Sequence, residues 1–328
     1  RMPLSAGGLA DVALFIAYSR VCNAIPWSPE IMSGTWTFPG QEHVPGELAS
    51  TDYEFLYLCT LAFGLKGMNF YMFADRDNWI DSPLDAAGCP APNLQAVRKV
   101  VRLLQEEPDF EVLQRRQDVA VMYHRPHARE AFIAGASAGP LEQDGTLLGF
   151  SYACFKSIFT ELHRQNMDPA VVDPRVRPED LGKHRMIFVP GGRQMEPATI
   201  SLLDDFASTG GKVVWVGRGP YGTGLSVNAR GEPDREKLAS LLRDGNLGPA
   251  VPANSPGVLT VLHRSPHVEW LFVINTAETG GEVTINFRDS AVKGMAALPD
   301  RESFILVDGP RALLSCRPRS VQVWSLER

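Results

Sequence analysis

The stretch GMNFYMFADRDNW, residues 67–79, joins an apolar, aromatic run to a dense polar loop. The run over residues 67–74 predicts a β-strand, because aromatic residues are enriched in strands. The loop over residues 75–79 follows at once, so polar groups stand just past the end of the strand. In (β/α) barrels parallel strands alternate with helices, and the catalytic and binding residues lie just past the carboxyl ends of the strands. The stretch therefore predicts a barrel unit.

The segments around this stretch continue the alternation. Three of them have helical composition and spacing of apolar residues: 8–20, 50–63 and 93–107. A short strand is predicted over residues 24–27, followed by a turn at Glu30. A closed barrel needs eight strands and about 250 residues, whereas only two convincing strands precede Pro108. We therefore expect residues 1–115 to be the last two units of a (β/α) barrel, completed by another segment or polypeptide.

The chain beyond Asp118 predicts two further domains. Continuous Val and Ile runs alternate with helices, which indicates a doubly wound parallel sheet over residues 116–250. Its predicted strands are 119–123, 170–172, 186–190 and 212–216, and its predicted helices are 152–166 and 197–208. Short alternating strands then indicate a small antiparallel β-sandwich over residues 251–328. These strands are 258–262, 269–275, 281–287, 303–307, 312–316 and 320–326. The prediction is an α/β chain of three domains.

The composition of the 328 residues excludes several classes of protein. Hydrophobic residues make up 44% and charged residues 21%, which is ordinary for a globular protein. The net charge is -6, and no basic block exceeds Arg115–Arg116, so the footprint of a nucleic-acid-binding protein is missing. The apolar start contains Asp11 and has no small-residue cleavage site, and no apolar run is long enough for a bilayer. Neither nucleic acid nor a membrane is predicted as a partner.

Cysteines and histidines give no pattern of a metal or disulfide site. The five cysteines lie far apart without a CxxC pair, which favours reduced thiols and a cytoplasmic setting. They are Cys22, Cys59, Cys89, Cys154 and Cys316. The spacing of His124, His127, His163 and His184 matches no set of metal ligands. We therefore predict neither a metal nor a cofactor.

Two segments resemble the β-galactosidases of glycoside hydrolase families 35 and 42, which belong to clan A. PEIMSGTW (29–36) is similar to their seventh-strand segment, in which a glutamate before a small-Gly-aromatic turn is the nucleophile. GMNFYMFADRDNW is similar to their eighth-strand segment. The resemblance implies a retaining glycoside hydrolase that acts on terminal β-linked galactose or a related β-glycoside. Glu30 then takes the place of the nucleophile.

The rest of the chain resembles the later domains of family 42. DVAVMYHR (118–125), MIFVPGG (186–192) and FASTGGKVVWVG (206–217) are similar to its flavodoxin-like trimerisation domain. EWLFVINTAETGGEVTINF (269–287) is similar to its C-terminal β domain. The resemblance implies a carbohydrate substrate and a homo-oligomer, which in that family is a trimer. It also implies that an upstream barrel segment is required for a complete site.

The chemistry of such an enzyme needs two carboxyl groups. A retaining glycosidase holds an ionised carboxylate about 5 Å from a protonated one. Glu30 is expected at the carboxyl end of a barrel strand, where this fold carries catalytic groups, and the alternative is a solvated loop carboxylate. In the family the acid follows the fourth strand, which this chain does not contain. Glu42 and Glu47 are near in sequence, but their Pro/Gly-rich loop favours a surface or subsite role. The chain alone is therefore predicted to be an inactive fragment without its acid/base glutamate.

Sugar-contacting residues are predicted around Glu30. Trp27 and Trp36 offer indole faces to sugar C–H groups, with plain packing as the alternative. Alternation along the second strand places Asn69 and Tyr71 on one face. The polar loop supplies partners for sugar hydroxyls, unless an internal Asp-Arg pair shapes the loop instead. Its candidate residues are Asp75, Arg76, Asn78 and Trp79.

Other functions fit parts of the sequence. One is a non-catalytic assembly or carbohydrate-binding module, in which the barrel remnant is structural. An amidotransferase-like enzyme is disfavoured, because Gly191 and Gly192 are followed by Arg193, Gln194 and Met195 without a cysteine nucleophile. A nucleotide site is disfavoured because the same turn lacks GxGxxG.

Overall fold

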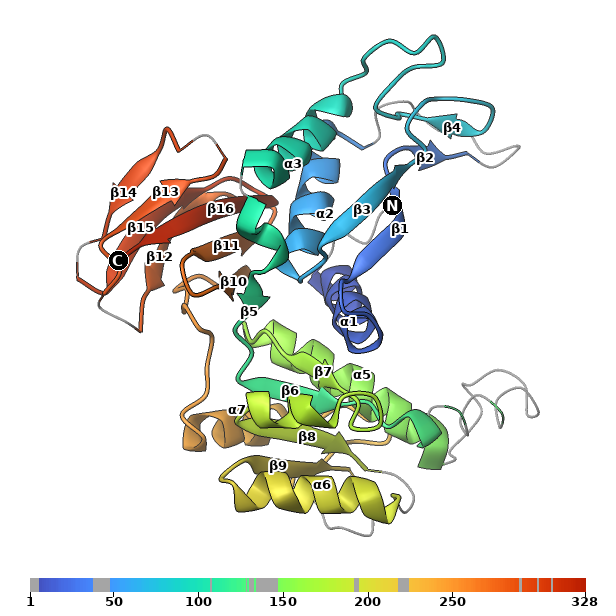
Figure 1. The fold of residues 1–328 in the computed structure, drawn as a ribbon, viewed down its shortest axis with the longest axis vertical. Helices are drawn as coiled ribbons and strands as arrows, with labels where there is room; N and C mark the ends of the chain where they lie inside the picture. Colours follow the sequence, from blue (N-terminus) through green and yellow to red (C-terminus); the bar gives the residue numbers. More distant parts are fainter. Residues whose placement is uncertain are drawn as a thin grey trace. The chain divides into compact units, whose positions relative to one another are not determined.

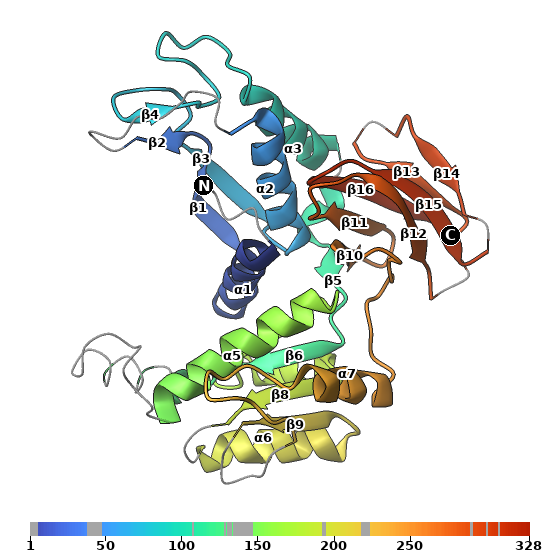
Figure 2. The same ribbon diagram turned by 180° about the vertical axis from the view of Figure 1, so that it is seen from behind.

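The computed structural model of the chain describes residues 6–37, 48–106, 108–127, 129, 133, 147–191, 195–217, 224–288, 291–299, 301–307 and 309–328. The chain divides into two compact units. The first comprises residues 1–16, 25–116 and 250–328, and the second comprises residues 17–24 and 117–249. Both units mix helices with strands, so the protein is α/β as predicted (Figures 1 and 2). Within the described ranges, no helix has the length and the apolar composition needed to cross a membrane.

The first part of the first unit is built on two parallel strands. β1 (Trp27–Met32) pairs with β3 (Gly67–Tyr71), and beyond them β2 (Thr35–Trp36) pairs antiparallel with β4 (Trp79–Ile80). The helices are α2 (Ser50–Ala62), α3 (Leu94–Glu106) and the first part of α1 (Ala6–Cys22), whose residues 17–22 belong to the second unit. Figure 1 shows α2 lying beside α3, with β3 next to α2. Helices and strands alternate along this segment in the predicted order.

The predicted turn at Glu30 is wrong, because this residue lies inside β1. Ser28 faces Met68 and Ile31 faces Phe70, so β1 has one residue more than β3 between these two pairs. This irregularity is a β-bulge that contains Pro29 and Glu30. Proline has no N–H to give to a ladder and is tolerated in strands at bulges. The bulge therefore accommodates Pro29, and β1 continues past the predicted turn to Met32.

The second part of the first unit is antiparallel. One sheet has six strands in the order β14-β13-β16-β11-β10-β5, and β12 and β15 form a second sheet. Their bounds are β5 (Gln114–Arg115), β10 (Val258–Arg264), β11 (Glu269–Asn275), β12 (Gly281–Asn286), β13 (Gly294–Ala297), β14 (Phe304–Leu306), β15 (Arg311–Cys316) and β16 (Ser320–Glu327). Buried residues of both sheets, such as Leu271 and Ile285, share one apolar core. The sequence did not predict β5 and β13, since strands of two and four residues show little periodicity.

Lys66 and His263 connect the two parts of the first unit. The Lys66 ammonium donates to the carbonyls of Phe110 (2.8 Å) and Leu113 (2.6 Å), just before β5, and lies 4.3 Å from the centroid of the Phe110 ring. Nε2 of His263, a buried residue of β10, lies 2.8 Å from the carbonyl oxygen of Ala62 at the end of α2. Side chains thus satisfy backbone carbonyls where the helical part meets the antiparallel sheet.

We expect Lys66→Met to lower the free energy of unfolding of the first unit by about 2 kcal/mol. The methionine keeps the apolar stem but removes a charged donor, and hydrogen bonds to charged groups contribute about 1.5–3 kcal/mol. Urea unfolding monitored by tryptophan fluorescence measures the change. Lys293→Met is the matched control, because Lys293 is exposed and its ammonium has no partner among the described residues. An equal loss of stability in both variants would contradict the role given to Lys66.

The second unit contains a four-stranded parallel sheet in the order β7-β6-β8-β9. The strands are β6 (Val119–Met122), β7 (Ala170–Val172), β8 (Met186–Pro190) and β9 (Lys212–Val216), close to the predicted ranges. β6, β7 and β8 are buried along their whole length, which explains their continuous apolar runs.

Helices cover both faces of this parallel sheet. They are α5 (Leu147–Arg164), α6 (Pro197–Ser208), α7 (Arg235–Asp244) and the short 3-10 helix η3 (Pro178–Lys183). Figures 1 and 2 view the sheet from opposite sides, with α6 in front in the first and α5 in front in the second. Right-handed crossovers in opposite directions from β6 and β8 require this placement. α7 was not predicted, although Asp234 caps it by accepting from the Lys237 N–H at 3.0 Å.

Candidate functional site

Glu30 lies in the bulge of β1, two residues before the strand ends. Its side chain is exposed, whereas that of the next residue, Ile31, is buried. The Ser28 hydroxyl donates to the backbone carbonyl of Glu30 at 2.9 Å, which fixes the local backbone. Among the residues that the structure describes, no hydrogen bond or ion pair reaches the Glu30 carboxylate. The carboxylate is therefore accessible to a ligand.

The backbone just after β1 is held by buried polar contacts. Ser33 is fully buried, its N–H donates to the carbonyl of Tyr71 (2.8 Å), and its hydroxyl donates to the carbonyl of Met72 (2.7 Å). The Tyr57 hydroxyl donates to the carbonyl of Met32 at 3.3 Å. Burial, and then the neighbouring Tyr53, raise the pKa of Tyr57 far above its ordinary value, so this hydroxyl keeps its proton. These contacts join the carboxyl ends of β1 and β3.

Three aromatic rings gather past this end. Trp36 and Trp79 face each other across β2 and β4, with ring centroids 5.0 Å apart and planes at 80°. Tyr71, the last residue of β3, meets Trp79 edge to face at 5.4 Å. Trp36 is 40% exposed and Tyr71 38% exposed. Partly exposed indole and phenol groups offer apolar area together with polar hydrogen-bonding groups. This combination suits the binding of a sugar ring.

The polar loop between β3 and β4 is organised mainly by its backbone. The Asp75 carboxylate accepts from the Ser82 N–H at 2.7 Å, and the carbonyl of Asn78 accepts from the N–H and the hydroxyl of Thr37, at 2.7 and 2.9 Å. Arg76 and Trp79 exchange backbone hydrogen bonds of 3.2 and 2.7 Å. In this described loop, no ion pair joins Arg76 to a neighbouring aspartate, so the internal pair considered from the sequence is not formed.

The structure brings most of the predicted residues to one end of the strand pair. Glu30, Trp36, Tyr71 and Trp79 lie at or past the carboxyl ends of β1 and β3. Asp75, Arg76 and Asn78 belong to the loop that connects β3 with β4. Asn69 is exposed like Tyr71, on the same face of β3. Glu42 and Glu47 lie outside the described residues.

Trp27 is placed apart from this group. It begins β1 and faces Gly67, the first residue of β3, at the amino ends of both strands. A Cβ on Gly67 would lie 2.2 Å from two carbons of the Trp27 ring, so glycine permits this packing. At about 3.3 Å per residue, Trp27 and Met32 are about 16 Å apart along the strand. The grouping of Trp27 with Trp36 around Glu30 is therefore corrected, since Trp27 begins β1 and Trp36 lies beyond its other end.

Sequence reasoning missed the tyrosines behind the site. Tyr53 and Tyr57 of α2 are buried, and their hydroxyls reach the Thr35 hydroxyl (3.2 Å) and the Met32 carbonyl (3.3 Å). Their spacing of four residues places them on one face of the helix, with ring centroids 6.2 Å apart. Two tyrosines at this spacing in a helix with many apolar residues are a signal that a buried polar contact is needed.

The cysteines are free thiols in the structure. Cys59, Cys154 and Cys316 are buried, whereas Cys22 and Cys89 are exposed. Burial raises the pKa of Cys154 to about 12. Among the described residues, no group of three His, Cys, Asp or Glu side chains is arranged to hold a metal ion.

Known proteins are similar to this chain, weakly in sequence and more clearly in fold. No family model matches the sequence. A β-1,2-glucosyltransferase of Ignavibacterium album is 22% identical over 242 residues, which cover 63% of this chain and 33% of that protein. The β-galactosidase of Bacillus circulans sp. alkalophilus superposes over 97% of this chain with a TM-score of 0.69 and 14% identity. A catalytic mutant of a GH42 β-galactosidase from G. stearothermophilus superposes over 99% with a TM-score of 0.68 and 12% identity.

The chain shares its fold with GH42 β-galactosidases. The resemblance found in the sequence is therefore confirmed, and it extends over nearly the whole chain. This chain spans 58% of the length of the Bacillus circulans protein and 57% of that of the G. stearothermophilus protein.

Proposed function

We propose that the first unit contributes the last two strands of a (β/α) barrel to a retaining glycoside hydrolase of the β-galactosidase type, with Glu30 as the nucleophile. One observation carries this proposal. An exposed carboxylate with no partner among the described residues stands near the carboxyl end of a parallel strand, where polar and aromatic side chains gather. This is the end of the strands at which (β/α) barrels carry catalytic groups. The fold shared with GH42 β-galactosidases supports it.

In this proposal Glu30 attacks the anomeric carbon of a β-glycoside. A carboxylate oxygen bonds to that carbon, the glycosidic C–O bond breaks, and the leaving oxygen takes a proton from a carboxylic acid about 5 Å away. Water then attacks the glycosyl-enzyme, gives its proton to the same acid group, and releases the sugar with retained configuration. We place that acid on a barrel strand outside these 328 residues.

The surface of the strand pair supports further barrel units beside it. Parallel strands are usually buried on both faces, yet Trp27, Met32, Tyr71 and Phe73 are exposed large side chains on or next to β1 and β3. A barrel with additional strands and helices would cover such side chains. General acid catalysis contributes about 10²- to 10⁴-fold to the rate, so the chain alone is expected to be nearly inactive.

The test compares this chain with a polypeptide that also carries the upstream barrel segment. Both are assayed with an aryl β-galactoside, and retention is read by NMR from the configuration of the first product. We expect turnover by the longer protein alone. Full activity of the 328-residue chain would show that its acid is not missing, and turnover with inversion would remove the nucleophile role of Glu30.

A second candidate function is glycosyl transfer. It is favoured by the similarity to the β-1,2-glucosyltransferase of Ignavibacterium album. The same glycosyl-enzyme serves both reactions, because a sugar hydroxyl can replace water in the second step. An aryl β-glucoside incubated with glucose separates them: a β-1,2-linked disaccharide formed faster than free glucose is released would indicate the transferase.

In the protein that carries the upstream barrel segment, we expect Trp79→Ala to lower kcat/KM for the aryl β-galactoside by about 10- to 100-fold, mainly through KM. The indole contacts both Trp36 and Tyr71, so its loss removes apolar area and loosens both neighbours, at a cost of about 1–3 kcal/mol. Trp27→Ala is the matched control, because it removes an indole at the opposite, amino end of the same strand pair. An equal rise of KM in both variants would contradict the position proposed for the substrate.

We also propose that the second unit serves assembly into a homo-oligomer. Its similarity to the trimerisation domain of family 42, drawn from the sequence, supports this role. Sedimentation velocity at micromolar protein is expected to give a mass near three chains. A monomer under these conditions would contradict the proposal.

A further inference from the structure

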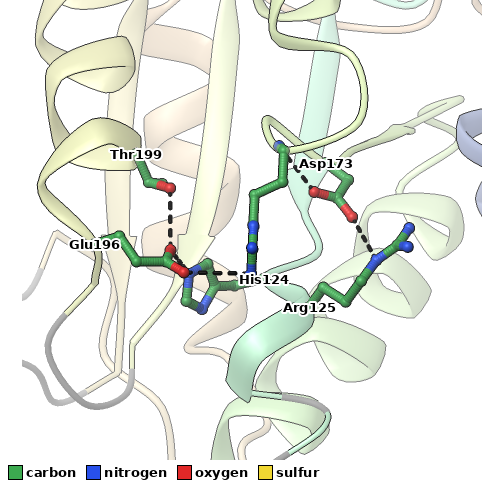
Figure 3. Close-up of polar contacts among 6 residues, drawn as sticks. His124, Arg125, Asp173, Glu196 and Thr199 are labelled. Atoms are coloured by element: carbon green, nitrogen blue, oxygen red, sulfur yellow. Dashed lines mark hydrogen bonds and ion pairs between the residues drawn. The ribbon is translucent and has the colours of Figure 1, made fainter.

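The second unit gathers charged side chains at one edge of its parallel sheet. The strand order β7-β6-β8-β9 means that the chain leaves β6 toward one side and later returns to its other side at β8. In open parallel sheets, ligands bind outside the carboxyl ends of the strands at this switch point. His124 and Arg125 follow the end of β6, Asp173 follows β7, and Glu196 follows β8 and precedes α6. Polar groups from three strand ends thus meet at one place (Figure 3).

The two carboxylates of this cluster are occupied by neighbours. Asp173, with 1% of its side chain exposed, accepts from Arg125 Nε at 3.0 Å and from the Arg175 N–H at 3.0 Å. Glu196 lies 3.1 Å from His124 Nε2, forms an ion pair with Arg175 Nη1 at 3.3 Å, and accepts from the Thr199 hydroxyl at 3.4 Å. Burial raises the pKa of Glu196, but the hydrogen bond from His124 and the positive charges of His124 and Arg175 outweigh it, so the pKa is lowered.

Among the described residues, the two guanidinium groups have N–H donors without a partner. Arg125 uses Nε on Asp173 and Nη2 on the Cys22 thiol (3.7 Å), and Arg175 uses Nη1 on Glu196. Arginine carries five N–H donors in a planar fork that matches a carboxylate or a phosphate. Arg175 has 48% of its side chain exposed, so its remaining donors are accessible. The first turn of α6, which begins next to Glu196, adds positive potential.

One buried nitrogen of the cluster has no hydrogen-bond partner among the described residues. The His124 side chain is 4% exposed, and its Nδ1 makes no hydrogen bond in the part of the chain that the structure describes. Figure 3 shows this nitrogen on the side of the ring away from Glu196. A buried polar atom left unpaired costs about 1–3 kcal/mol, so such atoms call for a ligand group or an ordered water. The Glu196 carboxylate engages Nε2, so Nδ1 is the ring nitrogen that remains for a polar group of a ligand.

We propose that this edge of the second unit binds a small hydroxylated anion, such as a sugar phosphate or a sugar acid. Arg175 holds the anionic group, and His124 Nδ1 forms a hydrogen bond with a hydroxyl of the body that carries it. Asp173 and Glu196 position the two arginines and the imidazole. The site lies in a unit to which the glycosidase proposal assigns no chemistry, so it stands independently of that proposal.

Titration calorimetry of the full chain tests the site with four probes: glucose 6-phosphate, glucuronate, inorganic phosphate and glucose. We expect saturable binding of at least one sugar anion with a dissociation constant below about 1 mM and no binding of glucose. Tighter binding of glucose 6-phosphate than of glucuronate identifies a phosphate ligand, and the reverse identifies a carboxylate. Absence of saturable binding for every anion up to about 10 mM would overturn the proposal.

Substitutions in the cluster test whether the sugar anion binds there. Arg175→Leu is expected to weaken the sugar anion at least about 10-fold, the effect of losing a charge-assisted pair. Arg230→Leu is the matched control, because Arg230 is an exposed arginine of the same unit outside the cluster. His124→Phe should reduce the affinity for the sugar anion to that for inorganic phosphate. If Arg175→Leu does not fold, Arg175→Lys replaces it, with an intermediate loss expected. Unchanged binding in the Arg175 variant would overturn the site.

Discussion

Replacing Glu30 with glutamine, in the protein that carries the upstream barrel segment, is expected to lower kcat/KM for an aryl β-galactoside by about 10⁴-fold or more. An amide cannot form the glycosyl-enzyme bond, and loss of the nucleophile in a covalent mechanism typically removes several orders of magnitude. The stability of the variant should be unchanged, since the Glu30 carboxylate is exposed and has no partner among the described residues. Steady-state kinetics and a thermal melt together test this expectation.

The control for this experiment lies in the same unit. Glu282 is an exposed glutamate of β12, and Glu282→Gln makes the same chemical change far along the chain. It should leave kcat/KM unchanged. Wild-type turnover in Glu30→Gln would show that Glu30 is not the nucleophile.

Replacing Glu30 with alanine gives a second test of its role as the nucleophile. In Glu30→Ala, added azide can occupy the vacated space and attack the anomeric carbon in place of the carboxylate. The expected product is an α-glycosyl azide, with configuration inverted relative to the β-substrate, because one displacement replaces two. Absence of rescue together with full activity of Glu30→Gln would reject the covalent route through this residue.

Trp270→Ala is expected to lower the free energy of unfolding of the first unit by about 3–5 kcal/mol, the usual cost of removing a large buried aromatic ring. Trp270 of β11 is completely buried and stacks on Phe110 at 5.2 Å between ring centroids, with Phe272 at 6.3 Å. Phe110 lies in the segment that precedes β5, and its carbonyl accepts from Lys66. The cavity would therefore loosen the connection between the strand pair and the antiparallel sheet.

Trp270→Phe is the matched control. It keeps an aromatic ring in the stack and removes the indole N–H, which is buried and has no partner within the described residues. Removing an unpaired buried donor offsets part of the lost contact area, so a loss of about 1 kcal/mol or less is expected. Denaturant unfolding followed by near-UV circular dichroism measures both variants. If Trp270→Phe destabilised as much as Trp270→Ala, ring packing would not be the main contribution.

The sequence predicted the elements with a strong local pattern. β8 and α6 begin and end where they were predicted, because a continuous apolar run and a Pro-initiated apolar helix are signals within a few residues. The two-residue strand β5 escaped prediction because its partner, β10, lies far along the chain. α7 was missed although Asp234 caps it, since its apolar stripe is short.

The candidate site was predicted in part for the same reason. The flanks of Glu30 and the polar loop after β3 are local patterns, so Trp36, Tyr71 and Trp79 were grouped from the sequence, and their rings meet at one strand end. Trp27 was grouped with them because it is near in sequence. The pairing of Trp27 with Gly67 depends on the register between two strands separated by a helix, which local patterns do not specify.

By itself the sequence determined the order of helices and strands, the likeness to β-galactosidases and the identity of the exposed carboxylate at Glu30. Tertiary structure alone decided that Pro29 and Glu30 form a bulge, that Trp27 and Trp36 lie at opposite ends of β1, and that His124 meets Glu196. The physical reason is the range of the interactions. Propensity and periodicity act over a few residues, whereas register and side-chain clusters arise from contacts between distant segments, such as that of His263 with Ala62.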